Sequence, residues 1–206
     1  DAACYLASPE IVAASAIAGH ICGPHGDAGD AALQFSMEED AELSQPHAPV
    51  RNALIDGFPA RLEGAAVACL DDNINTDGIY PGKYTYDERV AGELQARVAF
   101  ENYDHAFAQT ARRGDAIVAG FNFGTGSSRE QAATCLKHFG APLLVAGSFN
   151  ETYKRNALNN GVIAIQCERL VRHLQASISD RGKAVRLPSR LAVDSERGCV
   201  SFGGAE

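Results

Sequence analysis

The sequence predicts an α/β domain in which a central, mainly parallel sheet is flanked by helices. Short apolar runs typical of buried strands alternate along the chain with stretches of helical periodicity. The 206 residues, 46% hydrophobic and 21% charged, are also typical of a globular domain with a good-sized core. We expect strands at 65–71, 115–121, 142–149 and 162–167, and helices at 87–103, 128–140, 151–161 and 168–180.

The first sixty residues are predicted to be an appendage of this domain. Residues 8–22 have the composition of a closely packed helix, with Ser8 suited to the N-cap and Pro9 to the first helical position. Gly23 and Pro24 end that helix, and the turn-rich stretch after them has little periodicity. The sequence therefore predicts three parts: 1–23, the tail of a preceding unit; 24–60, a linker; and 61–206, the main domain.

In the main domain each predicted strand leads into a loop or a helix. The strand AAVACLD at 65–71 precedes a long loop, and the strand at 115–121 leads into a glycine-rich loop. Gly140 and Gly161 end the next two helices. After the last helix, the runs KAVRLP, LAVDS and CVSF predict short strands that add a β-rich layer.

Charge and cysteine content argue against several function classes. A formal net charge of −8 disfavours nonspecific binding to nucleic acid or to an anionic membrane. No apolar run reaches the roughly 18 residues that a membrane span needs. The six cysteines are scattered without a CxxC pair, and the histidines show no ligand spacing. We therefore expect a reducing compartment and no metal ligand in this chain.

The glycine-rich loop, GFNFGTGSSRE at 120–130, fails three common loop patterns. A phosphate-binding loop needs a lysine after its last glycine, but Ser127 follows Gly126. A dinucleotide fingerprint needs a third glycine where this chain has Arg129. A nucleophile elbow needs GxSxG, which GSSRE does not provide.

Two interpretations of this loop remain open. In the first it binds a carboxylate and transfers a proton, since it joins a strand to a helix, Arg129 offers a planar fork, and Ser127 and Ser128 add hydroxyls. In the second, Ser127 or Ser128 merely caps the following helix, with Glu130 or Gln131 in its first turn.

The loop DNINTDGIYPGKYTY at 72–86 has the same ambiguity. Asp77 can be a turn aspartate that binds its own backbone, and Lys83 can be a solvated lysine. Either can instead face the glycine-rich loop, because both loops follow strands and the carboxyl ends of strands carry the site in α/β sheets.

Together, DNINTDGIYPGKYTY and GFNFGTGSSREQAA resemble the swivel domain of the aconitase superfamily, in their order and approximate separation. CYLASPEIVAASAIAGHICGP at the N-terminus resembles the end of the third domain of the same enzymes. The segments GIYPGKYTY and FNFGTGSSREQAA are most similar to the homoaconitase family of fungal type. The resemblance covers about residues 4–23 and 62–170, and it implies a swivelling β/β/α domain.

The resemblance implies a hydro-lyase that interconverts homocitrate, homoaconitate and homoisocitrate in lysine biosynthesis through α-aminoadipate. It makes Ser127 the base that takes the proton from carbon, and Ser128 and Arg129 the residues that bind substrate carboxylates. Asp77 matches an active-site aspartate that handles protons or orients a histidine of another domain, and Lys83 falls in a loop that supplies a basic substrate contact. We expect the loop from Tyr84 to Tyr86 to help set the length of the acid accepted.

The cofactor implied is a [4Fe–4S] cluster with one open iron, whose cysteine ligands lie in other domains of the family and not in this chain. The implied partners are those cluster-binding domains, in the same polypeptide or in a large subunit, so we expect the chain alone to be inactive. The implied compartment is the mitochondrial matrix for a fungal enzyme and the cytoplasm otherwise. Two alternatives stay open: the swivel domain of a 3-isopropylmalate dehydratase or an aconitase, and a noncatalytic anion-binding domain.

Overall fold

The computed structural model describes residues 7–23, 51–87, 92–178 and 182–203. The chain divides into two units, 1–47 and 48–206, each of which is described by itself. In the first unit, helix α1 (Pro9–Ala18) begins at Ser8, whose side chain accepts a hydrogen bond from the Ile11 N–H. The predicted linker 24–60 lies mostly outside the described residues.

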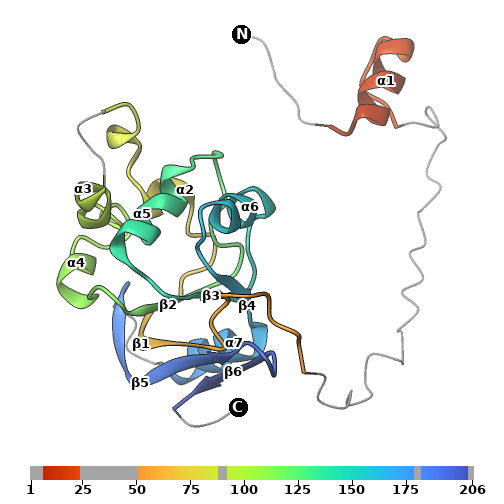
Figure 1. The fold of residues 1–206 in the computed structure, drawn as a ribbon. Helices are drawn as coiled ribbons and strands as arrows, with labels where there is room; N and C mark the ends of the chain where they lie inside the picture. The colour runs from red at the N-terminus through yellow and green to blue at the C-terminus, as the bar shows by residue number, and fades with distance from the viewer. Residues whose placement is uncertain (1–6, 24–50, 88–91, 179–181, 204–206) are drawn as a thin grey trace. The chain divides into compact units, whose positions relative to one another are not determined.

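The second unit is built on a six-stranded sheet in the order β4-β3-β2-β1-β5-β6 (Figure 1). Neighbours among the first four strands pair in parallel, and the last two strands add antiparallel pairs. The strands are β1 (Arg61–Cys69), β2 (Ala116–Ala119), β3 (Leu144–Ala146), β4 (Ala164–Gln166), β5 (Val185–Asp194) and β6 (Cys199–Phe202). The predicted α/β class with a mainly parallel sheet is therefore confirmed.

Helices lie on both faces of this sheet (Figure 1). On one face are α2 (Thr76–Ile79), α3 (Glu93–Arg97), α4 (Phe107–Thr110), α5 (Gln131–Phe139) and α6 (Glu151–Asn159), and on the other is α7 (Glu168–Ser177). No helix in the described part of the chain is both long and apolar enough to span a membrane.

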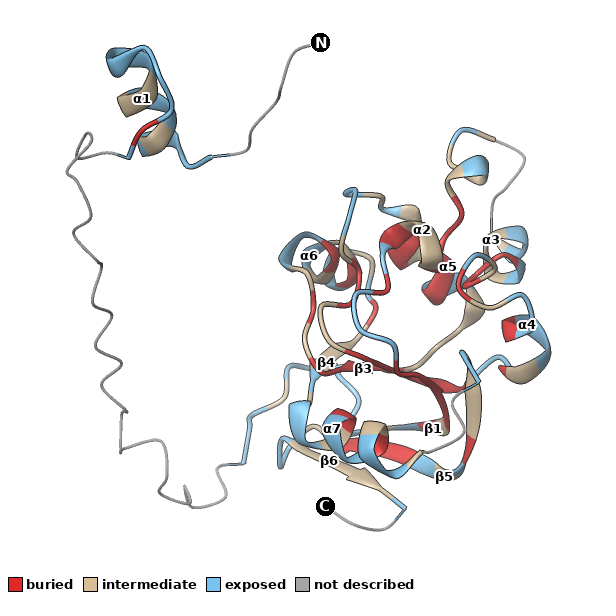
Figure 2. Cartoon of the chain, turned by 180° about the vertical axis from the view of Figure 1, so that it is seen from behind, coloured by how far each residue is buried: buried red, intermediate tan, exposed pale blue. Residues whose placement is uncertain are grey.

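The alternation of side chains along β1 produces two separate cores. Val67 and Cys69 pack into the core under α2, α5 and α6, whereas Ala66 and Ala68 pack into the core shared with α7. Buried residues concentrate in β1, β2 and β3, as expected for strands covered on both faces (Figure 2). These strands form a rigid base from which the loops at their carboxyl ends project.

The predicted helix at 87–103 is wrong in extent. Of its described part, only Glu93–Arg97 is helical, and Phe100 has a left-handed backbone (φ +60°), which cannot continue a helix. Phe100 is fully buried, and its N–H donates to the Ile79 carbonyl oxygen at 2.8 Å. Burial of this ring in a tertiary core therefore overrides the local helical pattern.

Two other predictions differ from the structure in which helices and strands form. The runs KAVRLP and LAVDS form one continuous strand, β5, because they pair along the whole of β1. The loop at 72–86 contains the single-turn helix α2 and a 3₁₀ helix at Gly82–Tyr84. Both differences concern short segments whose neighbours in space, not in sequence, decide their conformation.

Candidate functional site

The sheet places the loops after β1 and β2 next to each other. The two strands pair in parallel up to Cys69 and Ala119, and the chains that leave them stay paired at an isolated bridge between Asn75 and Thr125. The Thr76 N–H donates to the Thr125 carbonyl oxygen at 2.8 Å. The two segments that the sequence singles out therefore meet at the carboxyl end of the sheet, as parallel pairing requires.

Asp77 is held at the first turn of α2. The Asn75 side chain caps this turn by accepting a hydrogen bond from the Gly78 N–H at 2.7 Å. Thr76 is buried and Asp77 is half exposed. The cap and the buried threonine fix the turn, so that the aspartate side chain projects from it toward the second loop.

The central contact of the site joins Asp77 to Arg129. Arg129 Nη1 lies 2.8 Å from Asp77 Oδ1, and the Gly82 N–H donates to the same oxygen at 2.8 Å. Asn102 Nδ2 donates to Asp77 Oδ2 at 2.9 Å. The Arg129 hydrogen bond, then that of Gly82, hold the pKa of Asp77 below its usual range. Asp77 is therefore a carboxylate bound to a cation rather than a proton donor at neutral pH.

Ser127 lies at the exposed tip of the glycine-rich loop. Its Oγ is 3.5 Å from Thr76 Oγ1, which connects it to the first loop. Gly126 before it has φ +98°, in the region that favours glycine. Ser128 is exposed beside it. The structure thus brings Ser127, Arg129 and Asp77 to one edge of the sheet.

The helix-capping interpretation of the two serines is wrong. Helix α5 begins at Gln131, three residues later than predicted, with Glu130 in the N-cap position and no side-chain capping bond. Ser127 and Ser128 belong to the loop, where the Ser127 carbonyl oxygen accepts from the Arg129 N–H at 2.8 Å. Their hydroxyls are left for chemistry other than capping.

Lys83 makes its contacts away from the Asp77–Arg129 pair. Its Nζ lies 2.5 Å from Glu101 Oε1 and 4.8 Å from the centre of the Tyr84 ring. The Tyr84 hydroxyl donates to Glu101 Oε2 at 3.1 Å. The Glu101 hydrogen bond raises the pKa of Lys83, and the Lys83 hydrogen bond lowers the pKa of Glu101. In this conformation the positive charge of Lys83 is balanced by the Glu101 carboxylate.

The sequence patterns do not indicate three further residues of the site. Gly82 lies so close that a Cβ on it would be 2.9 Å from Asp77 Oδ1 and 3.1 Å from Arg129 Nη1. Thr76 contacts Ser127, and Asn102 binds Asp77. Asn102 falls inside the stretch predicted as helix, and the turn-forming run NYD that contains it was the available signal.

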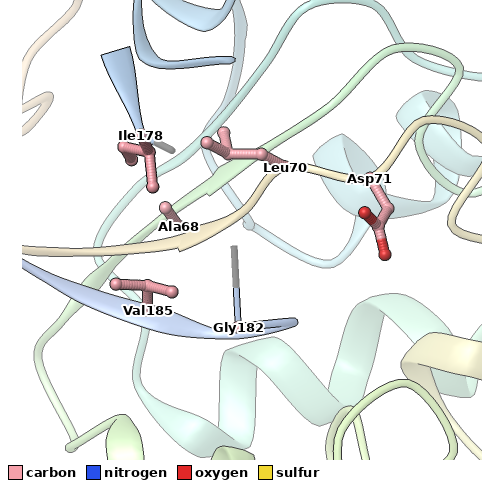
Figure 3. Close-up of a pocket in the computed structure, with 6 residues that line it drawn as sticks. All are labelled: Ala68, Leu70, Asp71, Ile178, Gly182 and Val185. Carbon is pink, nitrogen blue, oxygen red and sulfur yellow. The ribbon is translucent and has the colours of Figure 1, made fainter. Parts of the chain in front are cut away.

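Besides a cavity of about 230 Å³ that lies against the first loop at Asn75, Gly78 and Asn102, two cavities lie near these loops and differ greatly in size. One, of about 350 Å³, is lined by residues of the first loop and by two glutamines: Tyr80, Tyr84, Thr85, Tyr86, Asp87, Gln95 and Gln131. The other lies between the ends of β1 and α7 and the start of β5, where Ala68, Ile178 and Val185 converge (Figure 3). Its volume of about 10 Å³ has room for about one water molecule. Of these two, only the first is large enough for a small organic acid.

A metal site does not fit the described residues. Among them no group of three His, Cys, Asp or Glu side chains could hold a metal ion. Cys69 and Cys135 are fully buried, and burial raises the pKa of both thiols well above the usual range. Cys4 lies outside the described residues.

Comparison with known proteins gives a consistent result. The family described as the aconitase C-terminal domain matches residues 39–170. The mitochondrial homoaconitase of Mycosarcoma maydis is 41% identical over 100% of this chain and 33% of its own length. That of Eremothecium gossypii is 46% identical over 87% of this chain and 27% of its own length. This chain thus spans about a third of the length of these relatives.

A solved structure has a similar fold. A 3-isopropylmalate dehydratase from Methanocaldococcus jannaschii is 29% identical, with a TM-score of 0.52, over 68% of this chain and 79% of its own. The family match includes both loops of the site, because residues 72–86 and 120–130 lie within 39–170.

Proposed function

The chain belongs to the aconitase C-terminal domain family, and from this premise we propose that it is the swivel domain of a homoaconitate hydratase. The enzyme would interconvert homocitrate, homoaconitate and homoisocitrate in lysine biosynthesis. The similarity of the whole chain to two fungal homoaconitases supports this substrate class. The observation that carries the proposal is that the loop at 72–86 and the glycine-rich loop at 120–130 lie side by side. Arg129 is bound to Asp77, and Ser127 lies beside Thr76.

In this proposal Ser127 is the base. Dehydration breaks a C–H bond and a C–O bond on adjacent carbons, so one group must take the proton while a hydroxide leaves. The base form is the Ser127 alkoxide. Its Oγ is exposed at the loop tip, within 3.5 Å of the Thr76 hydroxyl, and becomes the neutral hydroxyl when it takes the proton from a substrate carbon held against the loop. In the reverse direction the same hydroxyl returns the proton.

Arg129 is the proposed carboxylate clamp, with Ser128 and Lys83 as further substrate contacts. Both bonds that the guanidinium makes to described residues come from Nη1, which leaves Nε and Nη2 for a bidentate pair with a substrate carboxylate. Asp77 stays ionised and keeps the guanidinium aimed, and we infer no proton donation from it. Lys83 reaches substrate only if its bond to Glu101 opens.

The rest of the enzyme is proposed to come from outside this chain. A [4Fe–4S] cluster, when bound by the other domains, supplies a Lewis acid for the substrate hydroxyl. The relatives are about three times as long as the aligned chain, which supports further domains in the same polypeptide. We propose that residues 1–23 end the preceding domain and that 24–60 link it to the swivel domain at 61–206. We also propose that the protein works in the mitochondrial matrix, since the names of its relatives call them mitochondrial.

The test is Ser127→Ala in the complete polypeptide. Loss of a general base should lower kcat by about 10²- to 10⁴-fold, measured as homoaconitate hydration. Ser177→Ala is the matched control, because that hydroxyl is exposed on α7 and bonds only the His173 carbonyl among the contacts described. A Ser127→Ala enzyme with wild-type turnover contradicts the proposal and favours a noncatalytic anion-binding domain.

One observation favours a second substrate. The similar solved structure is a 3-isopropylmalate dehydratase, so the complete enzyme should be assayed with homoaconitate, isopropylmalate and aconitate side by side. The ratio of kcat/KM values decides between them. The cavity of about 350 Å³ beside Tyr84 and Tyr86 is the proposed place where the length of the acid is measured.

A further inference from the structure

Asp77 is held from three sides, and the side chain that holds its second carboxylate oxygen, Asn102, has no place in the proposed chemistry so far. Oδ1 accepts from Arg129 Nη1 and from the Gly82 N–H, both at 2.8 Å. Oδ2 accepts from Asn102 Nδ2 at 2.9 Å, and the same amide nitrogen donates to the Asp77 backbone carbonyl oxygen at 3.2 Å. One amide thus fixes both the side chain and the backbone of the aspartate that binds Arg129.

The backbone around Asn102 is fixed by its neighbours. Phe100 is fully buried in the left-handed conformation, with its N–H bonded to the Ile79 carbonyl oxygen. Tyr103 is buried and its hydroxyl donates to the Lys183 carbonyl oxygen at 2.7 Å. Between these two anchors the Asn102 side chain is exposed, so it fills no core position. A buried frame that presents an exposed amide to Asp77 indicates a role for the amide itself.

We propose that Asn102 is a positioning residue for the reaction, which holds Asp77 so that Arg129 keeps its free donors aimed at a substrate carboxylate. The inference rests on the proposed function, because it needs Arg129 to bind substrate. Without the Asn102 bond, only Oδ1 of Asp77 is held, by Arg129 and the Gly82 N–H. The carboxylate can then turn about its last side-chain bond, and the direction of the Oδ1–Nη1 contact changes. Asn102 does not touch the reacting atoms.

The expected signature is a change in KM larger than the change in kcat. A substrate carboxylate is bound in both the ground state and the transition state. A misoriented Arg129 therefore weakens carboxylate binding equally in the two states. In the complete enzyme, Asn102→Ala should raise KM about tenfold, the equivalent of one hydrogen bond to a charged group, and change kcat by less than about twofold.

Asn102→Asp gives a second and sharper signature. It keeps the shape of the side chain but places a carboxylate against Asp77, and two adjacent carboxylates share a proton as the pH falls. The charged groups near this pair include Arg129, which faces Asp77 directly, and the Lys83–Glu101 pair on the neighbouring loops. Asp71, Asp72 and Lys183 line one cavity together with Asn102. The shared proton restores a donor to Asp77 Oδ2, so kcat/KM of Asn102→Asp should recover toward wild type as the pH is lowered. Asn102→Ala should show no such recovery.

Asn160→Asp is the matched control. Asn160 Nδ2 also donates to a carboxylate, Glu130 Oε1 at 3.0 Å, so this substitution makes the same charge change against another acid that lies outside the Asp77–Arg129 pair. It should leave KM and the pH profile of the enzyme at wild-type values. Circular dichroism and thermal unfolding of each variant establish that the compared enzymes are equally folded.

The outcomes separate the two proposals. A wild-type enzyme that hydrates none of the three acids overturns the proposed function itself. If wild type turns over and Asn102→Asp matches Asn160→Asp in KM and in pH profile, Asn102 is not a positioning residue. If Asn102→Ala lowers the melting temperature while KM stays at the wild-type value in the folded enzyme, its role is structural and the inference is wrong. A raised KM with recovery at low pH only in Asn102→Asp supports it.

Discussion

Among the residues that the structure describes, two aspartate–arginine pairs flank strand β2, and they differ in almost every physical respect. Asp115, just before β2, has a side chain only 5% exposed and takes two bonds from Arg186 of β5, the second between Oδ1 and Nη2 at 2.9 Å. Asp77, across from the loop after β2, is 47% exposed and takes a single bond from Arg129. In the first pair both terminal nitrogens of the arginine bond the aspartate, whereas in the second only Nη1 does.

The comparison shows how the same two residue types serve stability or binding. The Asp115 carboxylate also accepts from the Arg112 N–H at 2.7 Å, and Arg186 donates to the Thr110 carbonyl oxygen at 3.4 Å. These bonds tie β5 to the entry of β2 and leave little capacity for a ligand. At the Asp77 pair the aspartate carboxylate accepts three hydrogen bonds from the protein, whereas Arg129 uses only Nη1 among the bonds described. We infer that an incompletely bonded arginine held by this aspartate marks the binding end of the sheet.

The largest expected effect comes from breaking each pair at its aspartate. Asp115→Ala leaves the partly buried Arg186 without its carboxylate partner and should lower the free energy of unfolding by about 3 kcal/mol. This is near the low end for buried pairs, because the Arg186 side chain is one-third exposed. Asp77→Ala should cost less than about 1 kcal/mol, since its pair is open to solvent. Denaturant unfolding measures both.

The two substitutions should rank in the opposite order in their effect on turnover. In the complete enzyme kcat/KM per folded molecule should fall for Asp77→Ala and stay near wild type for Asp115→Ala. If Asp77→Ala destabilises the protein as much as Asp115→Ala and leaves kcat/KM unchanged, the division between a structural pair and a binding pair is wrong.

An added methyl group tests how tightly the Asp77 pair is built. A Cβ on Gly82 would lie 2.9 Å from Asp77 Oδ1 and 3.1 Å from both Nη atoms of Arg129, so Gly82→Ala must push the pair apart. We expect KM to rise about tenfold, as for loss of one charged hydrogen bond. The cause would be misdirection of Arg129, with its charge unchanged.

Gly78→Ala is the control in the same loop. A Cβ there meets no atom closer than 3.4 Å, at Asn75 Oδ1, so the added methyl group has room. Its KM should stay within about twofold of wild type. Equal KM values for the two variants, in steady-state assays of the complete enzyme, would show that the ion pair can shift without loss of binding.

The sequence was sufficient for the sheet and for the approach of the two loops, but not for the details of the pair. Parallel strands at 65–71 and 115–121 put Asp77 and Arg129 at one edge, because adjacent parallel strands end on the same side. The resemblance then named Ser127 and Arg129 as functional residues. These inferences rest on local patterns and on topology, which a single sequence carries well.

Asn102 and Gly82 could not be found in this way. Asn102 reaches Asp77 only because Phe100 breaks a predicted helix to enter the core, and that break depends on packing between distant segments. Gly82 matters for the empty space beside it, which is a property of the assembled loops. The contact of Lys83 with Glu101 likewise joins residues 18 positions apart. Tertiary packing, not local preference, fixes all three.

The smallest expected effect is the pH dependence of the Asp77 pair. Its pKa is lowered, first by the Arg129 hydrogen bond and then by the Gly82 N–H, so the folded state favours the charged form. The stabilisation is therefore complete above the unfolded value of about 3.9 and is lost as the pH falls through the lower folded pKa.

The matching measurement is the unfolding free energy of wild type and Asp77→Asn between about pH 6 and about pH 2. Because the pair is half exposed, the difference should be below about 1 kcal/mol at pH 6, and should vanish toward the acid end. A difference that stays constant over the whole range would mean that Asp77 contributes through its neutral hydrogen bonds and not through its charge. In that case Arg129 would be held by geometry alone, and the distinction from the Asp115 pair would lie in exposure rather than in electrostatics.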